Sequence, residues 1–129
     1  MKTNWLLLAA AIGLVLGCAP ENLPTLPEQK WQDITVHVEA RPTPLRSGAS
    51  EFWVILNDAR GLPVHDVMVN LRADASNWQQ AIQDGHTGVY RRAVLVKDPA
   101  SAALTVRLRR RDQAGELTFP LTPIAASTQ

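Results

Sequence analysis

The chain has 129 residues, of which 46% are hydrophobic and 19% are charged. A chain of this length has apolar residues for one core but too few for two, so we expect a single folded domain. The charges of its 13 basic and 12 acidic residues nearly cancel, so the protein as a whole is not strongly charged. The distribution is uneven, because residues 89–129 contain seven basic and three acidic side chains.

The N-terminus has the layout of a secretory signal. Lys2 precedes the apolar run "WLLLAAAIGLVLG", which ends at Gly17 and is followed by a proline-rich stretch. A basic start, a short apolar stretch and small residues at its end are typical of a signal peptide. The run is too short for a membrane span, which needs about 20 apolar residues. We therefore expect residues 1–17 to be a signal peptide that is cleaved.

The only cysteine, Cys18, follows this run directly, and a single cysteine excludes an intramolecular disulfide. The residues Val15, Leu16, Gly17 and Cys18 resemble the lipobox of bacterial lipoproteins. The resemblance implies that cleavage occurs before Cys18 and that its thiol is acylated, which anchors the protein at a membrane. Because Ala19 follows the cysteine, it also implies an outer-membrane lipoprotein of the cell envelope that faces the periplasm. In a Gram-positive cell, the same cysteine would place the domain outside the cell membrane.

The next segment, "APENLPTLPEQK", contains three prolines and no hydrophobic alternation. Such a composition favours an extended spacer. We expect residues 18–30 to be the lipidated cysteine and linker, residues 31–122 to be the folded domain, and residues 123–129 to be a frayed, flexible tail.

Apolar residues in the folded part recur with a period of two. The segments "ITVHVEA", "VMVNLRA" and "LTVRLRRR" alternate between apolar and polar positions, and turn residues separate them about every ten residues. This pattern predicts an all-β fold, an immunoglobulin-like antiparallel β-sandwich of about seven strands. Pro120 lacks an amide hydrogen, so the last strand is predicted to lie at a sheet edge.

Two stretches carry a resemblance to a family. "SGASEFWVILNDARGLPVHDVMVNLRA" and "DGHTGVYRRAV" are similar to the YtkA-like and FixH-like periplasmic modules, over roughly residues 31–121. The resemblance implies the immunoglobulin-like fold. The chain lacks the methionine-rich loop of many YtkA-like sequences, since Met68 is its only methionine after the start.

No pattern in the chain indicates catalysis. Ser47 and Ser50 have no glycine-flanked elbow of the kind that presents a nucleophile. The aspartates fall mainly in turns, where the side chain bonds nearby backbone amides. We expect no enzymatic activity and no cofactor.

A metal site is the alternative interpretation. His65, Met68 and His86 offer imidazole and thioether ligands, which suit copper. Their spacing does not define a ligand geometry, and Met68 is equally suited to fill a core. In the interpretation without a metal site, His86 is a solvated residue in a turn.

The arginines indicate a binding surface. Arg107 and Arg109 alternate with apolar residues, so both should lie on the outer face of one strand, with Arg91 or Arg92 of the preceding strand opposite them. Such a face suits anionic lipid headgroups, lipopolysaccharide phosphates or an acidic partner. A solvated face that prevents edge-to-edge pairing explains it equally well. No aromatic residues interleave with the arginines, so we expect no nucleic-acid binding.

The tryptophans complete the candidate surface. Trp53 is predicted to lie in the core because it is in the middle of a strand. Trp78, in the irregular segment "ASNWQQAI", is either a core residue or, if exposed, a contact anchor. The sequence thus predicts a non-catalytic lipoprotein that contacts another envelope protein through Trp78 and the arginines.

Overall fold

The computed structural model describes residues 17–18 and 23–127. Apart from Gly17, the predicted signal peptide lies outside the described residues, and so do residues 19–22 of the predicted linker. Within the described part of the chain, no helix is long and apolar enough to cross a membrane.

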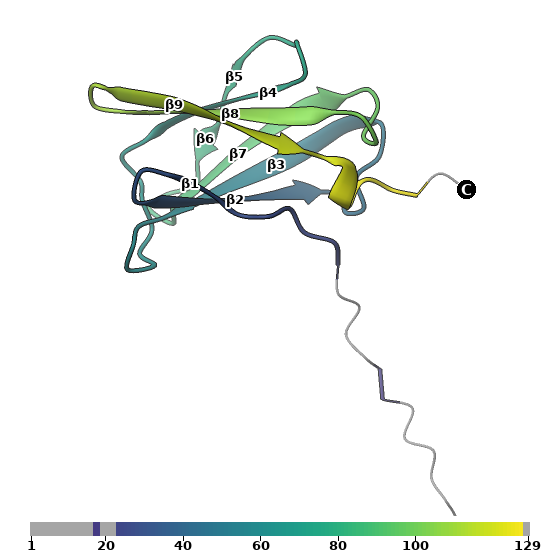
Figure 1. Ribbon diagram of the computed structural model, residues 1–129, viewed down its shortest axis with the longest axis horizontal. Coiled ribbons are helices and arrows are strands. Elements are labelled where there is room, and N and C mark those ends of the chain that lie inside the picture. The colour runs from purple at the N-terminus through teal and green to yellow at the C-terminus, as the bar shows by residue number, and fades with distance from the viewer. Residues whose placement is uncertain (1–16, 19–22, 128–129) are drawn as a thin grey trace, which may run out of the picture.

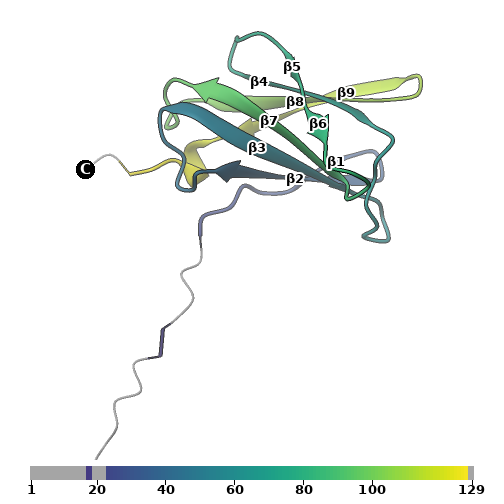
Figure 2. The ribbon, with the colours of Figure 1, turned by 180° about the vertical axis from the view of Figure 1, so that it is seen from behind.

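Two antiparallel sheets pack face to face (Figures 1 and 2), which confirms the predicted β-sandwich. The five-stranded sheet contains, in spatial order, β1 (Gln29–Trp31), β2 (Ile34–Arg41), β3 (Gly48–Asn57), β7 (Val89–Val96) and β6 (Ile82–Gln83). The four-stranded sheet contains β5 (Gln79–Gln80), β4 (Met68–Ala73), β8 (Ala103–Arg110) and β9 (Gln113–Pro120). The described residues form nine strands instead of about seven, because three of them are only two or three residues long.

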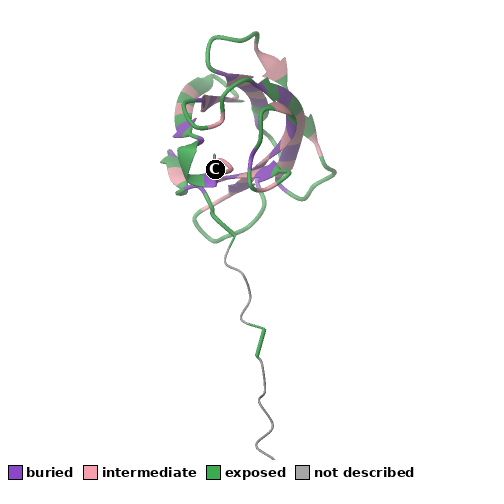
Figure 3. Cartoon of the chain, turned by 90° about the vertical axis from the view of Figure 1, so that its right-hand side faces the viewer, coloured by how far each residue is buried: buried purple, intermediate pink, exposed green. Residues whose placement is uncertain are grey.

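The alternation along each strand builds the core. In β2 and β4, every second residue is buried and the residues between are partly or fully exposed. Successive side chains of a strand point to opposite faces, so each sheet turns one apolar face toward the other sheet. Figure 3 shows the resulting alternation of buried and exposed residues along the strands. Burial of these side chains is the main favourable contribution to folding.

The chain changes sheets between β5 and β6. Strand β5 pairs with β4, whereas β6 pairs with β7 in the other sheet. Ala81 lies between the two short strands, is buried, and donates its amide hydrogen to the Val69 carbonyl at 2.8 Å. This crossing explains why the segment after β4 has no regular alternation in the sequence.

The domain is longer at both ends than the predicted range of residues 31–122. Leu26 is buried in the core, so the predicted linker already belongs to the domain at this point. At the other end, Ile124 is buried and its carbonyl accepts a hydrogen bond from the Leu45 amide at 2.7 Å. The amide of Ala126 donates to the Leu45 carbonyl at 2.8 Å. The prediction of a flexible tail from residue 123 is therefore wrong as far as Ala126.

Strand β9 lies at the edge of its sheet, which confirms the position predicted from Pro120. Part of this edge is covered, because the Gln29 side chain donates from Nε2 to the Thr118 carbonyl at 2.8 Å. The buried Trp31 indole lies against Gly115 of β9, where only a residue without a side chain leaves room for it. Strand β1 thus closes the sandwich beside β9.

Candidate functional site

A tryptophan and three arginines gather on the outer face of the four-stranded sheet. Trp78 lies in the connection between β4 and β5 and is partly exposed. The guanidinium carbon of Arg107, on β8, is 3.8 Å from the centre of the Trp78 ring, and that of Arg72, on β4, is 4.4 Å from it. Both distances lie within the range of cation–π contacts. We call Arg72, Trp78, Arg107, Arg109 and Glu116 the Trp78 face.

Local sequence positions the Trp78 side chain. Asp74 has a φ of 49°, a left-handed conformation that aspartate tolerates better than most residues and that turns the chain after β4. Its carboxylate accepts a hydrogen bond from the Ala103 amide at 3.0 Å, which ties this turn to the start of β8. After the tryptophan, Gln79 accepts a hydrogen bond from Arg92 Nε at 2.9 Å. The segment that carries the ring is thus held on both sides.

Positive charge exceeds negative charge on the Trp78 face. Arg107 donates from Nε and Nη2 to Glu116 Oε1, at 2.9 and 2.8 Å. Arg109 is exposed and stands between Met68 and Ala114 in the sheet register, so no acidic residue is opposite it. The Nε atom of Arg72 is buried and has no hydrogen-bond partner among the described residues. The face therefore has three arginines and a single carboxylate.

The predicted pairing of Arg91 or Arg92 with Arg107 and Arg109 is wrong. Strand β7 pairs with β3 and β6, whereas β8 pairs with β4 and β9, so consecutive strands lie in different sheets. Arg91 instead lies 3.8 Å from Glu51 and 3.7 Å from Asp84 on the five-stranded sheet. Arg107 and Arg109 do share the outer face of one strand, as predicted. Arg72, which the sequence did not indicate as part of this surface, reaches the Trp78 ring from β4.

Trp53 is not in the core. Phe52 and Val54 face inward, so Trp53 between them lies on the outer face of the five-stranded sheet, partly exposed. The Arg41 guanidinium is 4.0 Å and the Arg91 guanidinium 5.5 Å from its ring centre. Because both residues flanking Trp53 are apolar, the alternation in the sequence did not reveal its face.

The structure brings together two of the three candidate metal ligands. The rings of His65 and His86 stack with their centroids 5.0 Å apart and their planes at 24°. The nitrogen lone pairs lie in the ring planes, so nearly parallel rings cannot both direct a lone pair at one ion. Met68 is 47% exposed, so it does not fill the core. Within the described residues, no group of three histidine, cysteine or acidic side chains is placed to hold a metal.

Asp58 and Ser47 form hydrogen bonds with backbone groups. Asp58 accepts hydrogen bonds from the amides of Leu62 and Arg60, at 3.0 and 2.9 Å. The Leu62 amide is the largest of the influences that lower the pKa of this carboxyl group. Ser47 donates its hydroxyl hydrogen to the Lys97 carbonyl at 2.7 Å. The turn aspartate therefore organises backbone, as its position predicted.

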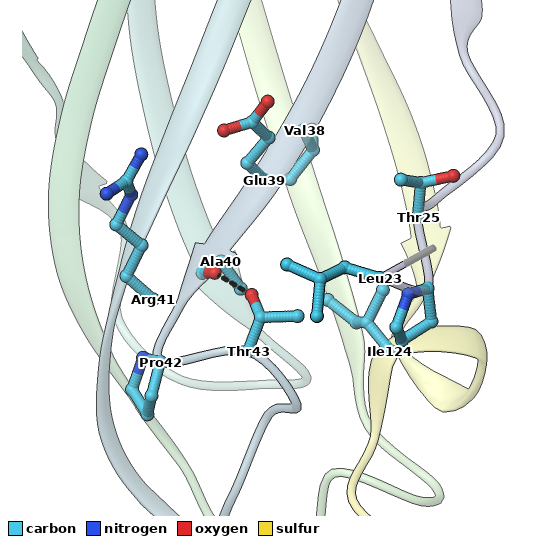
Figure 4. Close-up of a pocket in the computed structure, with 10 residues that line it drawn as sticks. Leu23, Thr25, Val38, Glu39, Ala40, Arg41, Pro42, Thr43 and Ile124 are labelled. Atoms are coloured by element: carbon cyan, nitrogen blue, oxygen red, sulfur yellow. Dashed lines mark hydrogen bonds between the residues drawn. The ribbon is translucent and has the colours of Figure 1, made fainter. Parts of the chain in front are cut away.

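A cavity of about 480 Å³ opens beside the end of β2 (Figure 4). Strand β1 begins at Gln29, so residues 23–25, which line one side of the cavity, do not pair with β2. Among the residues that line the cavity, only Glu39 and Arg41 are ionisable. The lining also contains the hydroxyl groups of Thr25 and Thr43, and Thr43 donates its hydroxyl hydrogen to the Ala40 carbonyl.

The chain matches no protein-family model, no curated protein and no solved structure.

Proposed function

We propose that the protein is a non-catalytic lipoprotein of the cell envelope, anchored through acylated Cys18, whose β-sandwich contacts another envelope protein. The Trp78 face is the contact surface. The observation that carries this proposal is the partly exposed Trp78 ring, which lies against the guanidinium groups of Arg72 and Arg107. Tryptophan and arginine are the residues in which protein–protein binding energy concentrates.

The anchor is inferred from the lipobox-like residues before Cys18 and from the position of the cysteine ahead of the domain. Cys18 is exposed and has a free thiol. The first buried residue after it is Leu26, so several residues separate the attachment point from the fold. A segment of this length, rich in proline, acts as a spacer between a membrane surface and the domain. Ala19 after the cysteine favours the outer membrane, with the domain facing the periplasm.

Protection of a sheet edge does not account for these arginines. Charges protect a sheet where a strand has no neighbour on one side. Arg107 and Arg109 lie on β8, which has β4 on one side and β9 on the other. A solvated face also has no need of a tryptophan, whose apolar ring costs free energy when it is left in water. Both observations favour an interaction surface.

The test is a cross-linking pull-down from intact cells that produce the full chain with a C-terminal tag. The variant combines Arg107→Glu and Arg109→Glu. A matched control combines Arg46→Glu and Lys97→Glu, two exposed residues outside the strands of the four-stranded sheet. We expect one envelope protein to be recovered with the wild type and the control and to be lost with the variant. Equal recovery from all three, or no reproducible partner, would overturn the proposal.

Metal binding is the second candidate function, and one observation favours it. His65 and His86 come from separate segments and meet at 5.0 Å, and His86 lies in an exposed turn between Gly85 and Gly88. Rotation of its side chain would let both imidazoles face one copper ion. A copper titration of the wild type and of His86→Ala tests this candidate. Stoichiometric binding that is lost in the variant would support it, and weak binding that is the same in both would dispose of it.

A further inference from the structure

The charges of the Trp78 face are not balanced within the face. Glu116 forms an ion pair with Arg107 at 2.8 Å, whereas Arg72 and Arg109 have no carboxylate within ion-pair distance among the described residues. Three arginines less one glutamate leave a surplus of two positive charges on this face. A partner of negative charge is therefore favoured over a neutral or basic one.

Arg72 combines a fixed position with an unused hydrogen-bond donor. Its Nε atom is buried without a partner, although its guanidinium carbon lies only 4.4 Å from the Trp78 ring centre. The buried Nε atom is closed to an external partner, whereas the Nη groups of the same guanidinium are not buried. A partner can therefore reach Arg72 through these Nη groups, and the planar guanidinium group matches a carboxylate in shape.

The sheet register sets the spacing of the two free arginines. Arg72 is opposite Thr105 on β8, and Arg109 lies four residues further along that strand. At about 3.4 Å per residue, this separation is about 14 Å along the sheet. Trp78 and Arg107 occupy the space between. In an extended peptide, side chains four residues apart lie on one side and have the same separation.

Resting on the proposed function, we propose that the Trp78 face binds an acidic segment of its partner protein. Two carboxylates of this segment, four residues apart, bind Arg72 and Arg109, and an apolar side chain packs on Trp78. The structure favours a peptide over a lipid surface. Recruitment to anionic lipid typically takes clusters of 4–8 basic residues, whereas this face has three arginines beside Glu116. Three arginines around one tryptophan suit a discrete docking segment.

The test uses the full chain in a neutral detergent and a synthetic peptide that contains Glu-Thr-Leu-Thr-Glu. The peptide with both glutamates replaced by glutamine is the control ligand. Binding is followed by NMR at the Trp78 indole N–H and the Arg72 Nε–H. We expect the glutamate peptide to bind at least tenfold more tightly than its control, and to bind more weakly in high salt, because salt screens exposed charges.

The variants are Arg72→Gln and Arg109→Gln, with Arg46→Gln as the matched control. Each of the first two should weaken binding of the glutamate peptide about tenfold, and the control should not. Because Arg109 is exposed, its variant keeps the test valid if Arg72→Gln fails to fold. Similar binding of the two peptides, no binding of either, or unchanged binding in both variants would overturn the inference.

Two further outcomes separate this inference from the proposed function. If vesicles that contain anionic lipid shift the two N–H signals and the glutamate peptide does not, the acidic-peptide inference is overturned in favour of a lipid ligand. A partner that is captured in cells through Arg107 and Arg109, without any binding of the glutamate peptide, would also overturn it while leaving the proposed function intact. Peptide binding without a cellular partner would overturn the proposed function and, with it, the inference that the acidic segment belongs to a partner protein.

Discussion

Arg92 and Gln79 connect the two sheets beside the Trp78 ring. The Nε atom of Arg92, on β7, donates a hydrogen bond to Oε1 of Gln79, on β5, at 2.9 Å. Strand β7 belongs to the five-stranded sheet and β5 to the four-stranded sheet. Because Gln79 directly follows Trp78, this bond restrains the short segment that carries the indole ring.

Arg92→Met should loosen that segment while leaving the sandwich folded. The substitution removes the hydrogen bond and keeps much of the apolar stem, so we expect faster amide hydrogen exchange in residues 76–80 and a loss of about 1 kcal/mol of stability. Hydrogen-exchange mass spectrometry measures the first and urea unfolding the second. Arg91→Met, on the opposite face of the same strand, is the control. Equal exchange in residues 76–80 of both variants would show that the bond does not restrain Trp78.

Tyr90→Phe should destabilise the protein by about 1–3 kcal/mol. The Tyr90 side chain is 2% exposed, and burial raises the pKa of its hydroxyl group. This hydroxyl donates to the Val64 carbonyl at 3.2 Å and accepts from the Val67 amide at 3.4 Å. The variant leaves both backbone groups without this partner. An unchanged urea midpoint would contradict the prediction.

Asp66→Asn should reduce stability at neutral pH and have no effect in acid. The hydrogen bond from Arg110, at 2.9 Å, is the main cause that lowers the pKa of the Asp66 carboxyl group below 3.8. A lowered pKa in the folded state stabilises the protein above the unfolded value, and this contribution is lost as the pH falls through the folded value.

Because the Asp66–Arg110 pair is partly exposed, we expect a difference of only about 0.2–1 kcal/mol at pH 7. The difference should shrink as the pH falls below the unfolded pKa and disappear below the lowered pKa of the folded state, where the wild-type carboxylate becomes protonated. Urea unfolding of both proteins at pH 7 and at a series of acidic pH values measures it. A difference that persists in acid would mean that Asp66 acts through something other than its charge.

Gly115→Ala should destabilise the sandwich, because a Cβ atom at this position would overlap the Trp31 indole. Forcing an extra methyl group into a packed site typically costs about 1–3 kcal/mol. Ala114→Ser, at an exposed neighbouring position, should change stability by less than about 0.5 kcal/mol. Thermal unfolding compares the two, and equal melting temperatures would show that Trp31 moves without cost.

Cys18→Ala should release the protein from the membrane fraction of intact cells. Stable membrane attachment through lipid takes more than one acyl chain, and the variant has no thiol to carry them. Cell fractionation followed by mass spectrometry of the N-terminal peptide measures both location and lipid. A variant that still fractionates with membranes would contradict the lipid anchor. Ser47→Ala, which keeps Cys18, is the control variant.

The sequence by itself determined the strand content and the face of most side chains. Alternation places Arg107 and Arg109 on one outer face, because successive Cβ atoms of a strand point to opposite sides. Turn chemistry likewise predicted the backbone hydrogen bonds of Asp58. These properties depend on neighbours in the chain, so the order of residues is enough to predict them.

The tertiary structure alone decided which strands and side chains meet. Arg72 and Trp78 reach Arg107 only because β4 pairs with β8, and Arg91 is separated from Arg107 because β7 belongs to the other sheet. Trp53 faced outward although its neighbours are apolar on both sides. Strand pairing depends on the burial of both apolar faces at once, over contacts between distant parts of the chain, and no local pattern encodes it.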